Sequence, residues 1–220
     1  MSKDRDRRDN NKYRRKTDRF DKRRDHKSYS HKKFEEYVIV LDYLPRGHVE
    51  SRSRSFKTEP IIQSVGTNYF TLLELVPRKS YKSKIKVKDK LYIGPETRET
   101  VDHIKGRISY DELTANAKFE LEDTIKKVIK ENEDRFVEFF NNARPITTRM
   151  HQLELFPGVG KKIMWEILNA RKKAKFESFK DISKRVSKVP EPESMILKRI
   201  ISELQGDDKY YIFIRLPHEK

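Results

Sequence analysis

Hydrophobic residues in the first half of the chain come in short runs separated by turn-forming residues. Five runs rich in β-branched and aromatic side chains span residues 37–41, 61–65, 69–76, 91–93 and 101–108. Such runs are typical of β-strands, and the Gly-Thr-Asn at 66–68 suits a turn between the second and third strand. Five short strands in about 70 residues predict a small β-barrel over residues 34–108. Among small barrels we favour an OB-like one, which commonly offers a nucleic-acid face.

The apolar pattern changes to a helical period after residue 108. Residues 109–112, Ser-Tyr-Asp-Glu, have the spacing of a capping box, so a helix is predicted to begin at Ser109. Its buried stripe comprises Leu113, Ala117, Leu121, Ile125, Val128 and Ile129. A polar break at 131–134 precedes further helical spacing that ends before Pro145. Residues 109–143 are therefore predicted to form a helical connector.

A turn with two glycines, Pro-Gly-Val-Gly-Lys-Lys, lies between two segments of helical apolar spacing. The apolar residues that flank it are Leu153, Phe156, Ile163, Ile167 and Leu168. Glycine adopts positive φ without steric cost, so the backbone of Gly158, Val159 and Gly160 can present its amides at the start of the next helix, where anions bind. Lys161 and Lys162 have the wrong charge for a helix N-terminus unless an anion is present. The alternative is an ordinary helix end followed by a new helix, which needs only one glycine.

A weaker copy of this unit follows, with its bend about 33 residues after the first. Its bend at 189–193, Val-Pro-Glu-Pro-Glu, lacks glycine and carries Glu191 and Glu193, which would repel a phosphate. We expect this copy to be structural and to complete a helical domain over residues 144–206. The apolar run at 210–216 predicts a C-terminal strand within residues 207–220 that pairs with a sheet edge.

The first 33 residues differ in composition from the rest of the chain. They carry 15 Lys or Arg and 6 Asp, which is +9 of the formal net charge of +16. Three large aromatic side chains cannot build a core, so residues 1–33 are predicted to be a disordered basic arm. The chain has no cysteine and its six histidines are scattered, so no metal or cofactor is expected. No apolar run is long enough for a membrane span, which favours a soluble, cytoplasmic protein.

The loop at 45–57 between the first two predicted strands is rich in cations and hydroxyls. Its candidate phosphate ligands are Arg46, Arg52, Arg54 and Lys57, and Phe56 is a candidate for stacking on a base. The alternative is a solvated loop with Phe56 packed on the barrel.

The stretch Leu-Glu-Leu-Phe-Pro-Gly-Val-Gly at 153–160 resembles the helix-hairpin-helix motif of nucleic-acid proteins. In that family the hairpin amides and a following cation hold phosphates without reading bases, which maps here onto Gly158, Gly160, Lys161 and Lys162. Met164 stands where the family usually has a small residue. Together with the stretch at 38–47, the motif gives residues 36–216 a resemblance to an archaeal family of uncharacterised proteins that join an OB-like barrel to a tandem helix-hairpin-helix domain similar to that of the Holliday-junction protein RuvA. The resemblance implies an α+β fold and nucleic-acid binding, with RNA favoured over DNA, and it supplies no catalytic residues.

Three functions are open at this stage. The first is a non-enzymatic protein that binds nucleic acid largely independently of sequence. The second makes both domains protein-docking modules of a ribosomal or repair assembly. The third is a DNA glycosylase, because Lys162 and Asp181 follow the glycine turn at suggestive offsets, although the large helical domain that a flipped-base pocket requires is missing. The sequence leaves the oligomeric state open.

Overall fold

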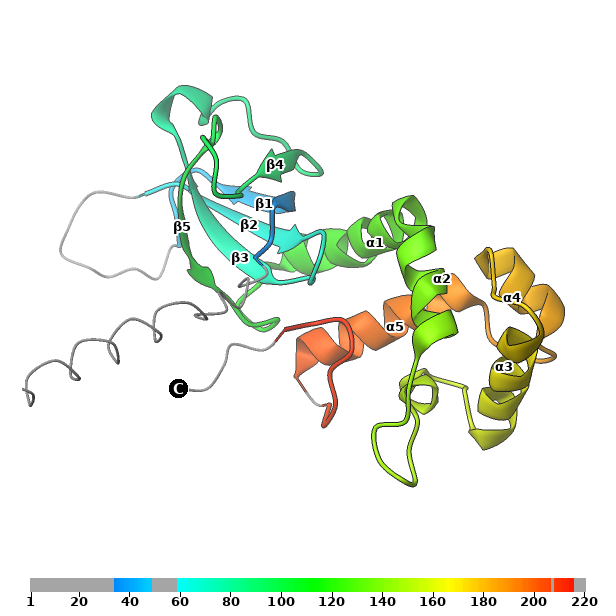
Figure 1. Ribbon diagram of the computed structural model, residues 1–220. Helices are drawn as coiled ribbons and strands as arrows, with labels where there is room; N and C mark the ends of the chain where they lie inside the picture. Colours follow the sequence, from blue (N-terminus) through cyan, green and yellow to red (C-terminus); the bar gives the residue numbers. More distant parts are fainter. Residues whose placement is uncertain (1–33, 49–58, 207, 216–220) are drawn as a thin grey trace, which may run out of the picture. The chain divides into compact units, whose positions relative to one another are not determined.

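The computed structural model describes residues 34–48, 59–206 and 208–215, which combine one antiparallel sheet with five α-helices (Figure 1). The strands are β1 (Tyr37–Leu44), β2 (Ile61–Gly66), β3 (Leu72–Pro77), β4 (Lys90–Tyr92) and β5 (Val101–Arg107). Their order is β4-β1-β2-β3-β5, and a 3₁₀ turn, η1 (Lys79–Tyr81), follows β3. The five predicted strands are confirmed. The sheet curls into a half-barrel, with β4 and β5 as its two edges among the described residues.

Alternating side chains give the sheet two apolar faces. One face is filled by a compact cluster that includes Val38, Val40, Ile62 and Leu75. The opposite face contributes Ile39, Leu41, Val65 and Leu72 to a larger cluster that continues through the helices. The sheet and the helices therefore share a core, and the chain from Phe34 onward groups into one compact unit. The domain boundaries at 108, 143 and 206 stay predictions.

Helix α1 (Ala115–Glu131) packs on the sheet, and α2 (Glu133–Asn142) follows after a break at Asn132. The predicted break is confirmed, but the predicted start at Ser109 is wrong. The Ser109 amide does donate to the Glu112 carboxylate at 2.7 Å, yet these residues close a turn that precedes the helix. The N-cap is Thr114, whose hydroxyl accepts a hydrogen bond from the Ala117 amide at 3.0 Å.

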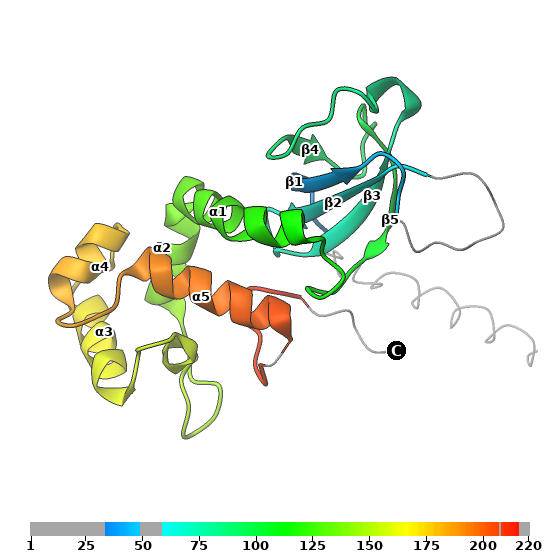
Figure 2. The ribbon, with the colours of Figure 1, turned by 180° about the vertical axis from the view of Figure 1, so that it is seen from behind.

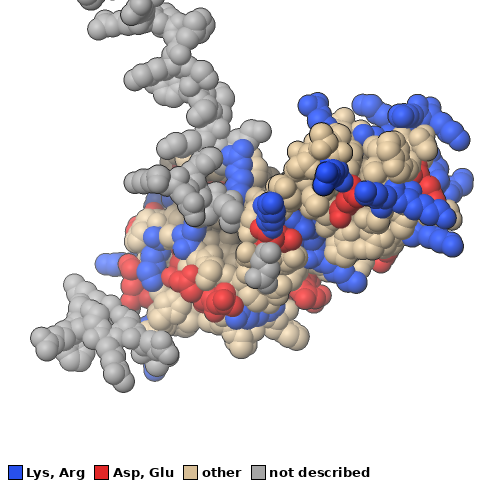
Figure 3. Space-filling view, turned by 90° about the horizontal axis from the view of Figure 1, so that it is seen from below, with Lys and Arg blue, Asp and Glu red and all other residues tan. Residues whose placement is uncertain are grey.

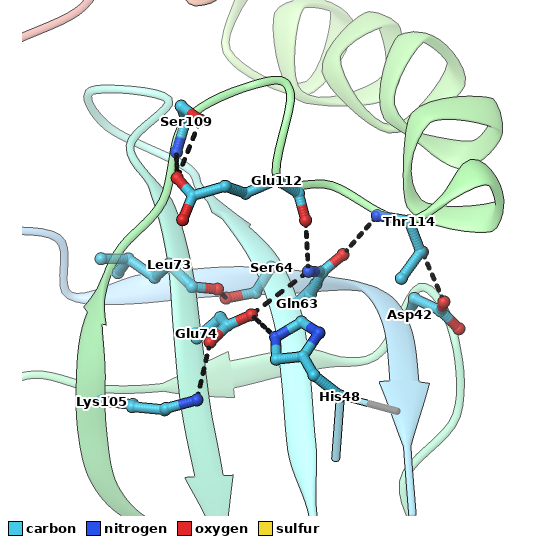
Figure 4. Close-up of polar contacts among 10 residues, drawn as sticks. All are labelled: Asp42, His48, Gln63, Ser64, Leu73, Glu74, Lys105, Ser109, Glu112 and Thr114. Atoms are coloured by element: carbon cyan, nitrogen blue, oxygen red, sulfur yellow. Dashed lines mark hydrogen bonds and ion pairs between the residues drawn. The ribbon is translucent and has the colours of Figure 1, made fainter. Parts of the chain in front are cut away.

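A polar network fixes where α1 begins (Figure 4). The Gln63 side chain donates to the Glu112 carbonyl at 3.0 Å and accepts from the Thr114 amide at 2.8 Å. Beside it, Glu74 is buried and contacts His48 at 2.5 Å and Lys105 at 3.1 Å. Burial opposes ionisation of Glu74, but hydrogen bonds from His48, Gln63 and Lys105 outweigh it and lower the pKa of this carboxyl. These tertiary contacts explain why the helix starts later than the local pattern suggests.

The second half of the described chain is helical. It contains the 3₁₀ helix η2 (Gln152–Leu155), α3 (Lys161–Lys173), α4 (Phe179–Arg185) and α5 (Pro192–Gln205). Helix α5 lies along α1, as Figures 1 and 2 show from opposite sides. Within the described residues, no helix has the length and apolar character needed to cross a membrane.

The predicted C-terminal strand is wrong for the part of it that the structure describes. Residues 208–215 form no strand. Instead, the buried carboxylate of Glu203 accepts hydrogen bonds from the amides of Ile212, Phe213 and Ile214 at 2.9, 3.0 and 2.9 Å. Phe213 inserts among the rings of Phe136, Phe139 and Phe156. The Glu203 carboxylate and the phenylalanine cluster thus hold this segment in place of the backbone hydrogen bonds that a sheet edge would have provided.

Candidate functional site

The glycine turn at 156–160 connects η2 to α3, and its two glycines play different roles. Gly158 has φ +84°, which L side chains rarely adopt. A Cβ there would also lie 2.8 Å from Pro190 Cγ in the second bend. Gly160 has φ −86° and ψ −180°, an extended conformation open to any residue. The expectation that both glycines supply positive φ is therefore wrong for Gly160.

Packing holds the turn in place. Phe156 is buried and stacks on Phe140, with ring centroids 5.3 Å apart and planes inclined by 14°. Leu153 and Val159 are buried on either side of it. His151 caps η2 by accepting from the Leu153 amide at 3.2 Å. Burial and the charge of Arg171 lower the pKa of His151, which favours the neutral ring that this cap requires.

The start of α3 has free backbone donors. The Met164 amide donates to the Gly160 carbonyl at 2.9 Å, which is the first hydrogen bond of the helix. Among the described residues, no carbonyl or side chain accepts from the amides of Gly160, Lys161 and Lys162. No side chain caps this end of α3, and its first turn contains no acidic residue. The exposed amides and the helix dipole therefore create a positive potential that an anion would satisfy.

The lysines around this end are exposed, and they belong to a larger basic surface. Residues 161–188 contain ten Lys or Arg and three Asp or Glu, a net charge of +7. The remaining residues of 34–220 contain 26 of each sign and are neutral. All eight lysines of 161–188 are exposed: Lys161, Lys162, Lys172, Lys173, Lys175, Lys180, Lys184 and Lys188. In Figure 3, Lys and Arg side chains gather on the right-hand side, where Figure 1 places α3 and α4.

The two arginines of this segment serve the fold. Arg171 donates to the carbonyls of Phe140 and Ala143 at 2.8 and 2.9 Å. Arg185 donates to the carbonyls of Ala170 and Ala174 at 2.6 and 2.7 Å, and it pairs with Asp181 at 2.9 Å. Asp181, the acid of the glycosylase interpretation, is thus engaged in an ion pair on its own helix.

The structure brings together only part of the predicted site. Gly158, Val159, Gly160, Lys161 and Lys162 lie on one turn; the glycines and lysines are exposed and Val159 is buried. Arg46 is exposed in the loop after β1. The other loop candidates, Arg52, Arg54, Phe56 and Lys57, lie outside the described residues. Two features of this surface were not predicted: the concentration of charge in 161–188, which a charge count over short windows would have revealed, and the exposed Trp165 within it.

Comparison with known proteins places the chain in a family. The model of the family described as "Protein of unknown function (DUF655)" matches residues 34–215. The chain belongs to this family. A DUF655 relative, the "Uncharacterized protein MJ0038" of Methanocaldococcus jannaschii, is 44% identical over 185 residues, which cover 83% of this chain and 81% of that protein. The crystal structure of Af1531 from Archaeoglobus fulgidus, also of DUF655, is 47% identical with a TM-score of 0.73, and the match covers 82% of this chain and 100% of that one. The expected archaeal family and the α+β fold are confirmed at this level, and none of these descriptions gives a ligand or an activity.

Proposed function

We propose that this protein binds nucleic acid without catalysis, and that it holds the phosphate backbone at the turn between η2 and α3. RNA is expected ahead of DNA. The observation that carries the proposal is the start of α3, where three free amides and two exposed lysines meet without a cap or an acidic residue. Two cations at a helix N-terminus are unfavourable by themselves, and a bound phosphate would remove that cost.

The presence of glycine at position 160 also supports phosphate binding at the start of α3. Its backbone conformation does not require glycine, and a Cβ there would meet no atom within 4 Å. Ser, Asp or Asn would cap α3 better than glycine does. A glycine that the fold does not need leaves the backbone accessible to a close ligand.

The charge distribution favours a polymer over a single small anion. The eight exposed lysines of 161–188 lie on α3, on α4 and in the segments that follow these helices, so successive phosphates can each meet a cation. Lysine and main-chain contacts to phosphate carry little sequence information, so binding should be largely independent of sequence.

We also propose that the architecture is an OB-like half-barrel joined to a tandem helix-hairpin-helix unit. The strand order β4-β1-β2-β3-β5 is that of a five-stranded barrel left open between β4 and β5. In the helical part, Gly158 of the first bend and Lys188, just before the second, both have positive φ, and the two bends approach each other where Pro190 lies next to Gly158. The loop after β1, with Arg46 at its described end, would extend the contact.

The salt dependence of binding tests the proposal. A double variant, Lys161→Gln with Lys162→Gln, removes two phosphate contacts. We expect the slope of log affinity against log salt concentration to become shallower by about 1.4 to 1.8, measured by fluorescence anisotropy with a labelled 12-nucleotide RNA.

The matched control changes an adjacent lysine pair on another helix. Lys126→Gln with Lys127→Gln on α1 removes the same charge from exposed positions, so its slope should stay within about 0.5 of the wild type. Equal slopes for the two double variants would remove the turn from the interface. Absence of binding by the wild-type protein at low salt would overturn the proposal.

A further inference from the structure

Trp165 is the single tryptophan of the chain, and its side chain is 55% exposed on α3. The buried residues of this helix are Met164 and Ile167. At about 100° per residue, Trp165 lies about 100° from Met164 around the helix and therefore off the buried stripe. The core of the helical part does not depend on this ring.

Trp165 lies at the centre of the basic face of α3. The exposed positions on both sides of it are Lys161, Lys162, Asn169, Lys172 and Lys173. Lys161 and Lys162 precede it by four and three residues, so they are its neighbours on the helix surface. Side chains of a helix lean towards its N-terminus, which directs the indole to the turn where the free amides lie.

The residues around Trp165 favour a nucleic acid over a protein as the ligand of this face. A protein that covered Trp165 would also have to cover the lysines around it, and lysine is depleted from the buried centres of protein interfaces. A nucleotide matches both kinds of side chain, because its phosphate neutralises a lysine and its base stacks on an aromatic ring. In a duplex the faces of a base are covered by its neighbours, so a base must be unstacked to reach the indole.

We infer that Trp165 is the stacking platform for an unpaired base of the strand held at the turn, so that the ligand is single-stranded nucleic acid or an unpaired segment of a folded one. This inference rests on the proposed function and specifies its ligand.

The fluorescence of the protein tests it directly, because all tryptophan emission comes from this position. The full-length protein is titrated with three 12-nucleotide ligands: a single-stranded uridine RNA, a blunt RNA duplex, and an abasic strand with the same phosphates and no bases. We expect the single strand to quench Trp165 and the other two to leave its emission nearly unchanged. Trp165→Ala should weaken binding of the single strand by about 5- to 150-fold, while binding of the abasic strand changes by less than about twofold.

Phe119→Ala is the matched control, since Phe119 is an exposed aromatic residue on α1, 80% accessible. It should bind the single strand as the wild type does, and both variants should keep the wild-type free energy of unfolding within about 0.5 kcal/mol. Equal loss of single-strand and abasic binding in Trp165→Ala, or unchanged single-strand affinity, overturns the stacking role. In those cases the salt slope of the Lys161 and Lys162 variant still tests the phosphate grip separately. If the wild type binds none of the three ligands, both proposals fail.

Discussion

The two bends of the helical part each lie at or beside a residue of positive φ, but their side chains differ in charge. In the first, Gly158 has positive φ and Gly160 is the N-cap of α3; Lys188, just before the second, has positive φ, and Glu191 is the N-cap of α5. Pro190 and Pro192 have no N–H, and Glu191 and Glu193 place negative charge at the start of α5, so a phosphate would meet fewer donors and an acidic helix N-terminus at the second bend.

This difference indicates that the second bend has a structural role and packs against the first. Pro190 occupies the space beside Gly158 where a Cβ would lie. Helix α5 then contributes Arg199, which donates to the Leu155 carbonyl at the base of the first turn at 3.4 Å. The first bend presents free backbone groups, and the second bend with α5 packs against the first.

The largest change in the free energy of unfolding is expected when Arg199 loses its buried contacts. Its guanidinium is buried and pairs with Glu203 at 2.8 Å and with Asp208 at 2.8 Å. Arg199→Leu should lower the free energy of unfolding by about 3 to 5 kcal/mol, because it leaves the buried Glu203 carboxylate without its cation. Urea denaturation followed by circular dichroism measures this change.

Arg199→Lys serves as the control, since it keeps a charge near Glu203 but cannot reach all the acceptors of the guanidinium. Its loss of stability should fall between the wild type and Arg199→Leu. A cost below about 1 kcal/mol for Arg199→Leu would show that the buried pair of Arg199 with Glu203, and the contact of Arg199 with the first turn, contribute little to stability.

Smaller changes in stability, of opposite sign, are expected from substitutions at the two glycines of the first bend. Gly158→Ala forces positive φ on a residue with a Cβ and overlaps Pro190, so it should cost about 1 to 2 kcal/mol from the backbone alone. Gly160→Ser introduces a favoured N-cap and should raise stability by a few tenths of a kcal/mol. Its hydroxyl then competes for the amides of α3, so RNA affinity should fall while stability rises. Unchanged affinity would argue against the free amides as phosphate ligands.

The smallest expected effect is a dependence of stability on pH, which arises at the first bend and not at the second. The first is entered through a cap made by His151, whereas α4, which leads into the second, is capped by the non-titrating Ser178. The pKa of His151 is lowered in the folded protein, so below about pH 6.5 the unfolded chain takes up the proton first. Its contribution to stability is thus complete above about pH 7.5 and declines as the pH falls towards the folded pKa. Urea titrations at pH 7.5 and 5.5 should show a smaller decline for His151→Asn than for the wild type, and equal declines would exclude this role.

The sequence allowed the elements to be predicted where local pattern determines them. The five strands, the break near Asn132 and helix α3 after the glycine turn all follow from apolar spacing and turn residues, whereas the segment before that turn forms only the short 3₁₀ helix η2. Two predictions were wrong because tertiary contacts decided the outcome. Thr114 is the cap of α1 because Gln63 and Asp42 hold it, and the segment at 212–214 binds Glu203 instead of a sheet edge.

For the candidate site, the turn and its two lysines were identified from the sequence, but the extended backbone of Gly160 was not predicted. Its φ is ordinary, and only the coordinates show that the space beside it is open. The exposure of Trp165 also depends on which face of α3 packs inward. A charge count over short windows would have located the basic surface from the sequence alone.

Arg185 sets the distance between charges on that surface. By holding the carbonyls of Ala170 and Ala174 together with Asp181, it ties the end of α3 to α4. The lysines on these two helices therefore cannot be respaced without giving up those bonds. If the proposed polymer binds to this fixed arrangement of charges, the polymer has to adjust its own shape, which a chain with freely rotating torsions can do and a stiff rod cannot.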